Sequence, residues 1–217
     1  QPGWHIDLPA TTGVRSVILT DTGWSIAGES AGTPGAPWVA GLDPTGHLTW
    51  ERTYKDLAAD DAPVLANLDA GEIMLAVHST EGDSDQLWLR RLSADGEPLE
   101  TRRLSLAFGK QDGLRALTHL TRDAEGALWL AGMTLEQDAW LARLSSTGET
   151  LWTGRYGRAA LNLFNDLHVR PDGLIAVGHT LSPDTEACGL WIATLDTNGQ
   201  PHPAPEYSSS ARDLITH

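Results

Sequence analysis

Four tryptophans at nearly equal spacing constrain the fold of this chain more than any other feature. Trp38, Trp88, Trp140 and Trp191 are separated by 50, 52 and 51 residues. Each is followed by a leucine four positions later and by a glycine eight positions later. One copy of the repeat reads DAWLARLSSTG over residues 138–148. Repeat units of this size bury their apolar faces by stacking on their neighbours, so the four copies are expected to form one stacked array.

Every repeat contains four predicted strands. The tryptophan segment is the third, because it is rich in Trp, Leu, Val and Ile and is flanked by glycine-containing turns. The glycine that follows it, at position 46, 96, 148 or 199, suits a hairpin turn that needs positive φ. The first strand is shorter and more polar than the others. No segment shows the 3.6-residue hydrophobic period that would predict a helix instead of a strand. Four such repeats predict an all-β fold, a β-propeller of four blades with four antiparallel strands each.

Both chain ends are candidates for the last strand of the ring. Residues 4–8 match the fourth-strand segments around Trp50 and Trp152, so we expect the N-terminal strand to complete the last blade and close the ring. Residues 201–217 also read as a weak fourth strand followed by the start of another repeat. We assign residues 1–200 to a single propeller domain and residues 201–217 to a C-terminal tail or extra strand. Two alternatives stay open. The chain can be one part of a larger propeller that another chain or further sequence completes, or it can have a different repeat architecture.

The composition narrows the classes of partner. The formal net charge of −14 argues against nucleic acid and against an anionic membrane surface, since both require a basic footprint. No run of about 18 apolar residues is present, so no membrane span is predicted. A single cysteine excludes an internal disulfide. The charge is compatible with a partner protein of basic character, and with a monomer or a homodimer.

The repeat resembles the bacterial β-propeller repeats found in many secreted and periplasmic proteins. The resemblance lies in the Trp-x3-Leu-x3-Gly element followed by a further tryptophan, as in residues 138–152, and covers most of the chain from Trp4 to Gly199. It implies a propeller and, together with an N-terminus at Gln1, a periplasmic or secreted location. It implies no particular activity, because such repeats carry many functions. A similarity to quinoprotein repeats is limited to Thr-Gly before a tryptophan, and no cofactor is predicted.

Acidic residues concentrate in the loops that are expected to share one face of the propeller. The loops between the second and third strands carry eight acids, including Glu29, and no lysine or arginine. Loops between blades add further acids to the same face, where Lys110, Arg155 and Arg158 partly offset them. Such a face is expected to attract a basic protein by long-range electrostatics. The predicted binding residues are Asp60, Asp61, Glu81, Asp83, Asp85, Glu136, Asp138, Asp184 and Glu186.

The first strands are expected to line a central channel and to bring polar side chains towards its axis. A ring of such groups can bind a polar ligand or perform acid–base chemistry. These strands supply no pair of carboxylates, which argues against a glycosidase. The channel candidates are Arg15, Arg115, His119, Asp166 and His168.

Two motifs resemble a catalytic serine site and a metal site, but the repeat pattern argues against both functions. Residues 28–32 match the G-x-S-x-G nucleophile elbow, but prolines and a glycine follow where that motif requires a helix. Glu29, His78 and His179 occupy one register in different repeats, and equivalent positions in different blades lie too far apart to share one ion. We therefore predict no catalytic serine and no metal site.

Three functional classes follow from the sequence. The first is a non-catalytic extracytoplasmic binding protein that uses the acidic loop face, including an inhibitor of a basic partner. The second is a hydrolase or lyase that uses channel residues His119, Asp166 and His168. The third is a structural half-propeller that completes a ring by dimerisation.

Overall fold

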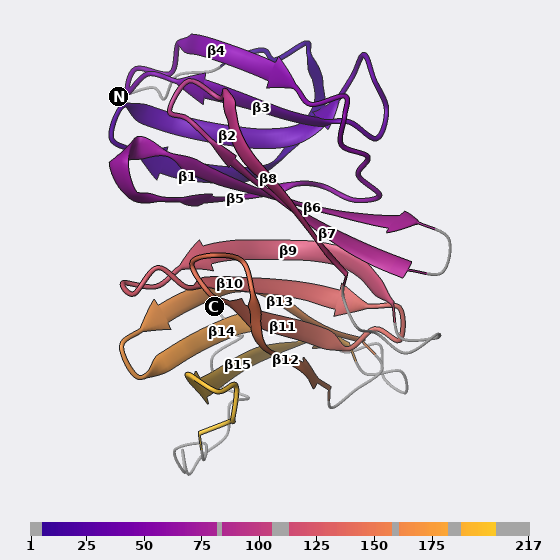
Figure 1. The fold of residues 1–217 in the computed structure, drawn as a ribbon. Helices are drawn as coiled ribbons and strands as arrows, with labels where there is room; N and C mark the ends of the chain where they lie inside the picture. Colours follow the sequence, from indigo (N-terminus) through magenta and orange to yellow (C-terminus); the bar gives the residue numbers. More distant parts are fainter. Residues whose placement is uncertain (1–5, 82–83, 106–112, 158–160, 182–187, 203–217) are drawn as a thin grey trace, which may run out of the picture.

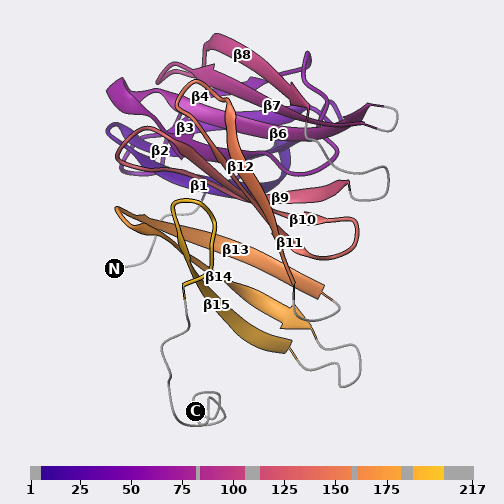
Figure 2. The same cartoon turned by 60° about the horizontal axis from the view of Figure 1, so that its bottom comes forward.

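The predicted β-propeller is present in the computed structural model of the chain, which describes residues 6–81, 84–105, 113–157, 161–181 and 188–202. The described residues form four antiparallel sheets, and consecutive strands are neighbours within each sheet. Each sheet corresponds to one tryptophan repeat and is one blade. Figures 1 and 2 show the blades following one another in chain order. The all-β fold with four blades is therefore confirmed.

The strands have the following bounds. Blade 1 contains β1 (Thr11–Thr20), β2 (Gly23–Ser30), β3 (Pro37–Leu42) and β4 (Leu48–Thr53). Blade 2 contains β5 (Val64–Asn67), β6 (Ile73–Glu81), β7 (Ser84–Leu92) and β8 (Pro98–Ser105), with a single 3-10 turn at Asp69–Gly71. Blade 3 contains β9 (Leu114–Arg122), β10 (Leu128–Thr134), β11 (Ala139–Leu144) and β12 (Thr150–Tyr156). Blade 4 contains β13 (Leu161–Arg170), β14 (Gly173–Leu181) and β15 (Cys188–Asp196).

The turn after the third strand has the same construction in every blade. Its glycine adopts a positive φ between 76° and 88°, which is the conformation that the sequence predicts there. Asp43 fixes the first of these turns, because its Oδ1 accepts hydrogen bonds from the backbone nitrogens of Thr45 and His47 at 2.8 and 3.0 Å. Asp196 does the same in blade 4. Local chemistry therefore determines these hairpins.

Successive blades pack face to face, and strand alternation divides each tryptophan segment between the two faces of its sheet. We call the side of a sheet that packs on the next blade its forward face, and the side towards the preceding blade its backward face. In blade 3, Trp140 and Ala142 lie on the backward face, in the apolar cluster shared with blade 2. Leu141 between them lies on the forward face, in the cluster shared with blade 4.

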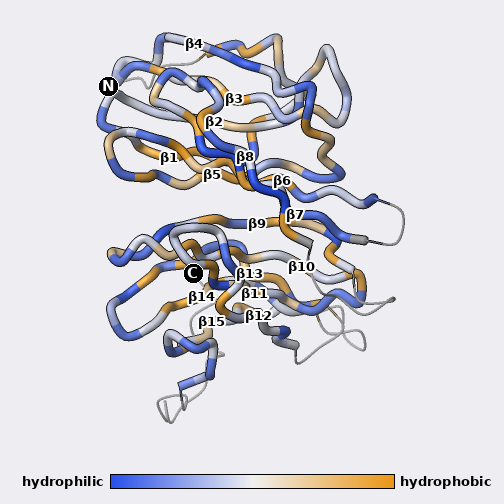
Figure 3. Tube along the Cα trace, viewed as in Figure 1, coloured by the Kyte–Doolittle hydropathy of each residue, from blue (hydrophilic) through white to orange (hydrophobic). Residues whose placement is uncertain are grey.

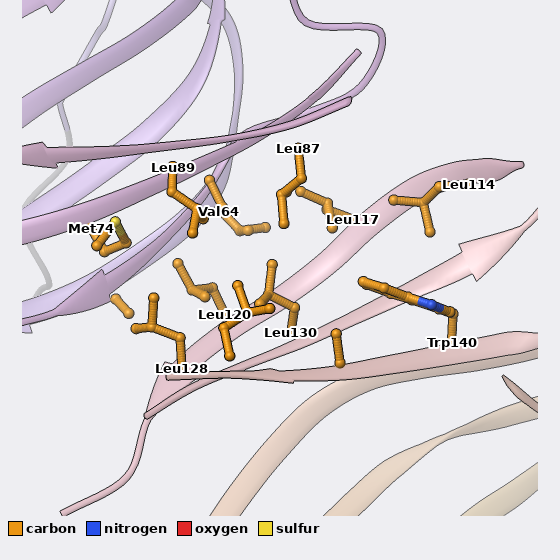
Figure 4. Packing of buried hydrophobic residues seen from close by; sticks show 14 residues of the cluster. Val64, Met74, Leu87, Leu89, Leu114, Leu117, Leu120, Leu128, Leu130 and Trp140 are labelled. Atoms are coloured by element: carbon orange, nitrogen blue, oxygen red, sulfur yellow. The ribbon is translucent and has the colours of Figure 1, made fainter. Parts of the chain in front are cut away.

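Three apolar clusters fill the junctions between blades 1 and 2, blades 2 and 3, and blades 3 and 4. Figure 4 shows the middle junction, where Leu120 and Leu130 of blade 3 face Val64 and Leu89 of blade 2. No such cluster of the described residues joins blade 4 to blade 1. Burial of these side chains provides the main driving force for stacking the blades.

The chain ends differ from the expected closure of the ring. Trp4 and His5 lie outside the described residues, while Ile6 and Leu8 form no strand and pack on the backward face of blade 1 beside Trp38. The described neighbour of β15 on its outer side is the C-terminal segment: Pro201 forms a bridge with Leu195. Beyond it, the His202 nitrogen donates to the Thr194 carbonyl at 2.8 Å. Pairing of the N-terminal strand with the last blade is thus not found in the part of the chain that the structure describes.

Candidate functional site

The first strands of the four blades converge on a central channel that contains two cavities. The larger, which we call the mouth cavity, has a volume of about 570 Å³ and lies on the side of the inter-blade loops. The second occupies about 480 Å³ further along the strands. Arg15 and Asn165 line both. The polar lining of the mouth cavity comprises Thr12, Arg15, Glu29, Asp60, Asp61, Thr118 and Asn165.

The loop between β4 and β5 brings Asp61 into the wall of the mouth cavity. Its Oδ2 accepts a hydrogen bond from the backbone nitrogen of Leu117 on β9, so the loop is tied to blade 3. Its Oδ1 is buried without a hydrogen-bond partner. Burial raises the pKa of Asp61 to about 7, with the Leu117 hydrogen bond and nearby His78 acting in the opposite direction. Asp61 therefore changes charge near neutral pH.

His78 and Asp85 form a buried pair behind Asp61. Nε2 of His78 lies 2.7 Å from Oδ1 of Asp85, while Nδ1 lies 3.8 Å from Oδ2 of Asp61. We assign the proton to Nε2, because an ionised carboxylate offers only acceptor atoms. Nδ1 is buried and has no hydrogen-bond partner. Asp85, predicted as a binding residue, is therefore placed inside blade 2, where it holds His78.

The neighbouring Asp60 also makes a local contact. Its Oδ2 accepts a hydrogen bond from the backbone nitrogen of Thr80 at 2.5 Å, which ties the inter-blade loop to β6. The side chain still lines the mouth cavity. Glu29 accepts a hydrogen bond from the Gly35 nitrogen at 3.2 Å and lines the same cavity. Three acidic residues and one arginine therefore line this space.

The other described loop acids pair with arginines of the outer strands. Glu81 pairs with Arg103 on β8. Arg155 on β12 lies 2.6 Å from Glu136 and 2.8 Å from Asp138. The polar character of β8 is visible in Figure 3. These arginines neutralise part of the negative charge of the loop face, as the sequence predicts for Arg155 but not for Arg103.

Asp83, Asp184 and Glu186 lie outside the described residues. The remaining predicted residues are those of the channel, and the structure brings two of them together. Nδ1 of His119 lies 3.3 Å from Oδ1 of Asp166, and His119 lines the second cavity. Burial lowers the pKa of His119, and Asp166 acts in the opposite direction. Arg115 and His168 are exposed and are not among the residues that line either cavity.

Sequence reasoning missed the link between His78 and its two aspartates. The repeat register relates His78 only to equivalent positions of other blades, whereas its partners come from its own hairpin and from the preceding loop. The available signal was the spacing: β6 and β7 form one hairpin, so His78 and Asp85 lie near each other across it. Within the described ranges, no group of three or more His, Cys, Asp and Glu is arranged to hold a metal ion.

The fold and the channel define this chain as a β-propeller. No protein-family model matches it, and a search of curated proteins gives no match. The described part of the chain contains no helix that is long and apolar enough to cross a membrane.

Proposed function

We propose that the protein is a non-catalytic binding protein that receives a cationic group of a partner protein in its mouth cavity. The observation that carries the proposal is the convergence of Glu29, Asp60 and Asp61 on one cavity of about 570 Å³. The volume lies in the usual range of ligand pockets and is large enough for a side chain with its flanking backbone. A guanidinium or ammonium group would donate charge-assisted hydrogen bonds to the accessible carboxylates that line the cavity.

The mouth cavity serves this function better than the rim of the loop face. The rim carboxylates of Glu81, Glu136 and Asp138 already have arginine partners, and exposed ion pairs add little to affinity. Asp61 is different, because Oδ1 has no partner and is shielded from water. A cation in contact with Asp61 stabilises the ionised carboxylate and lowers its pKa. Binding is therefore expected to strengthen as the pH rises through 7.

A setting outside the cytoplasm and a role as inhibitor belong to the same proposal. The repeat resembles those of bacterial secreted and periplasmic proteins, and the formal charge of −14 favours encounter with a basic protein. A partner whose basic side chain is held in the cavity would lose the use of that side chain, which amounts to inhibition.

The experiment uses two acetylated and amidated tripeptides, Gly-Arg-Gly and the same peptide with uncharged citrulline, in isothermal titration calorimetry. We expect the arginine peptide to bind at pH 8, to bind less tightly at pH 5.5, and to weaken in 0.5 M salt. Asp60→Asn should reduce its affinity about tenfold, whereas Glu125→Gln, on a turn of blade 3 outside the cavity lining, should not. Equal binding of the citrulline peptide, or no binding of either, would contradict the proposal.

A second candidate function rests on the contact between His119 and Asp166. A histidine 3.3 Å from a carboxylate, in a channel cavity, has the arrangement of an oriented general base. The test is hydrolysis of p-nitrophenyl acetate by the wild-type chain and by His119→Gln. A rate above that of buffer, lost in the variant with folding intact, supports a hydrolase. Identical rates for wild type and variant make this candidate wrong.

A further inference from the structure

Each junction between blades covers the same forward-face position of the third strand. The residue directly after the repeat tryptophan is Val39 in blade 1, Leu89 in blade 2 and Leu141 in blade 3. All three are 3% exposed or less, because the following blade packs on them. A large apolar side chain at this position therefore marks a surface that receives a neighbouring blade.

Blade 4 has this forward face but no described neighbour on it. The equivalent residue, Ile192, is 59% exposed, and Leu190 on the same face is 71% exposed. The strand pairing places Val177 opposite Ile192, so the apolar surface continues from β15 onto β14, and His179 lies opposite Leu190 at its edge. The surface is apolar at Val177, Leu190 and Ile192, and no described residues of the chain cover it as they cover the internal junctions.

Blade 1 has exposed apolar side chains on its backward face, the face that packs on the preceding blade at every internal junction. Val17 of β1 matches Leu65, Leu120 and Leu167 of the other first strands, because each pairs with the equivalent residue of the second strand. The three leucines are 5% exposed or less, whereas Val17 is 57% exposed and its neighbour Leu19 is 61% exposed. Ile6 and Leu8 pack with the buried cluster around Trp38 on this face but leave these β1 side chains open.

We propose that a second copy of this chain covers both faces, with blade 1 of each copy packed on blade 4 of the other in a closed ring of eight blades. Among the described residues, one forward face and one backward face have no cover, and these are the two surfaces that join at every internal junction. A two-fold arrangement uses each of them once per copy, which closes the assembly and prevents open-ended growth. This inference is independent of the mouth cavity and of the ligand proposed for it.

A second copy fits these faces because the contacts would continue those of the junctions inside the chain. Val17 on blade 1 would meet Ile192 on blade 4 as Leu120 of blade 3 meets Leu89 of blade 2 within one cluster. Burial of four large side chains that are now more than half exposed favours association, because it removes apolar surface from water. Both surfaces belong to sheets that are already ordered in the single chain, so little conformational entropy is lost on docking.

The test is sedimentation equilibrium of the full chain and of two variants, Val17→Glu and Ile192→Glu. We expect the wild type to be a dimer at micromolar concentration and each variant to be a monomer, because a buried unpaired carboxylate disrupts both interfaces of its homodimer. Both substitutions are at exposed positions of the single chain, so an unchanged circular dichroism spectrum should confirm that each variant folds. Leu151→Glu is the matched control, since Leu151 is equally exposed on β12, and it should remain a dimer.

A mixture of the two variants distinguishes the proposed ring from other dimers. A heterodimer of Val17→Glu and Ile192→Glu places both glutamates in one interface and leaves the other interface wild type on both sides. The mixture should therefore recover a dimer, although neither variant forms one alone. A monomeric wild type at 100 µM, a dimer that Val17→Glu does not weaken, or no recovery in the mixture would overturn the inference.

Discussion

Nε2 of His78 lies 2.7 Å from Oδ1 of Asp85, and both side chains are almost completely buried in blade 2. The pair fixes the end of the β6–β7 hairpin beside the loop that carries Asp61. A rigid hairpin at this point determines where the wall of the mouth cavity lies. The pair is therefore a positioning element for the candidate site, and its loss has a measurable cost.

His78→Ala should lower the free energy of unfolding by about 3 kcal/mol, because it leaves the carboxylate of Asp85 buried without its hydrogen-bond donor. Urea denaturation followed by tryptophan fluorescence measures the change. His47→Ala is the control: its side chain is exposed on the turn of blade 1, and we expect a change within about 0.5 kcal/mol. Similar losses in the two variants would show that the His78–Asp85 contact does not stabilise the fold.

Asp61 should make stability depend on pH between about 4 and 7. The folded chain holds this proton up to a pKa of about 7, whereas an unfolded chain releases it near pH 4. The folded state therefore binds more protons in this window, and its stability falls as the pH rises through it. In Asp61→Asn this loss should be absent, so the variant gains stability relative to the wild type by up to about 1.4 kcal/mol per pH unit.

Urea denaturation of Asp61→Asn and wild type at pH 4, 5.5, 7 and 8 measures this difference. Asp56→Asn is the contrast, since a hydrogen bond from Arg90 lowers the pKa of Asp56 below its ordinary value. That carboxyl contributes its stability above pH 4 and should show no loss between pH 4 and 7. A constant difference between Asp61→Asn and wild type at all four pH values would contradict the prediction.

Gly178→Ala should destabilise blade 4 by about 2 kcal/mol. A Cβ at Gly178 would overlap the carbonyl oxygen of Leu163 on the paired strand, and backbone cannot move aside as a flexible side chain can. Thermal unfolding of the variant should show a lower midpoint. Gly32→Ala is the matched control, because nothing lies within 4 Å of the position of its added Cβ. An unchanged midpoint for Gly178→Ala would disprove this close approach of the strands.

Asp123→Ala should cost more stability than the equivalent change at Asp43. Both aspartates fix a turn by accepting backbone hydrogen bonds on Oδ1. Oδ2 of Asp123 additionally accepts from Nε1 of Trp129 at 3.0 Å and from Nη2 of Arg143 at 2.9 Å. We expect a loss of about 2–3 kcal/mol for Asp123→Ala in urea denaturation, and a smaller one for Asp43→Ala. Equal losses would mean that the contacts of Asp123 with Trp129 and Arg143 add nothing beyond those of Asp43 with Thr45 and His47.

Much of the fold was predictable because its signals are local. The tryptophan spacing, the strand alternation and the turn glycines each act within a few residues, and all three repeat. The position of Gly178 is a case in point: its equivalents in blades 1 and 3 are Gly28 and Gly132, which also face a carbonyl oxygen of the first strand. In blade 2 the equivalent is Val77, which lies one residue beyond the last β5–β6 pair at Ala76 and is buried against blade 1.

The candidate site was less predictable, since it depends on contacts between segments that are distant in sequence. The sequence places Arg155 on the acidic face, but it does not show which acids Arg155 pairs with, nor that Arg103 of β8 pairs with Glu81. Nor could it separate Asp85, which is buried against His78, from Asp60, which lines the cavity. Both residues look alike in sequence, and their roles follow from burial.

The sequence by itself determined the number of blades, the order of strands within each blade and the turn that follows every tryptophan segment, because short-range propensity and alternation suffice for these. Only the tertiary structure decided which carboxyl groups are desolvated, as at Asp61, and which apolar faces are left without cover, as at Val17 and Ile192. Burial depends on how the blades pack. It decides whether a carboxyl group forms an ion pair or titrates near pH 7, and whether an apolar side chain is buried in a junction or exposed.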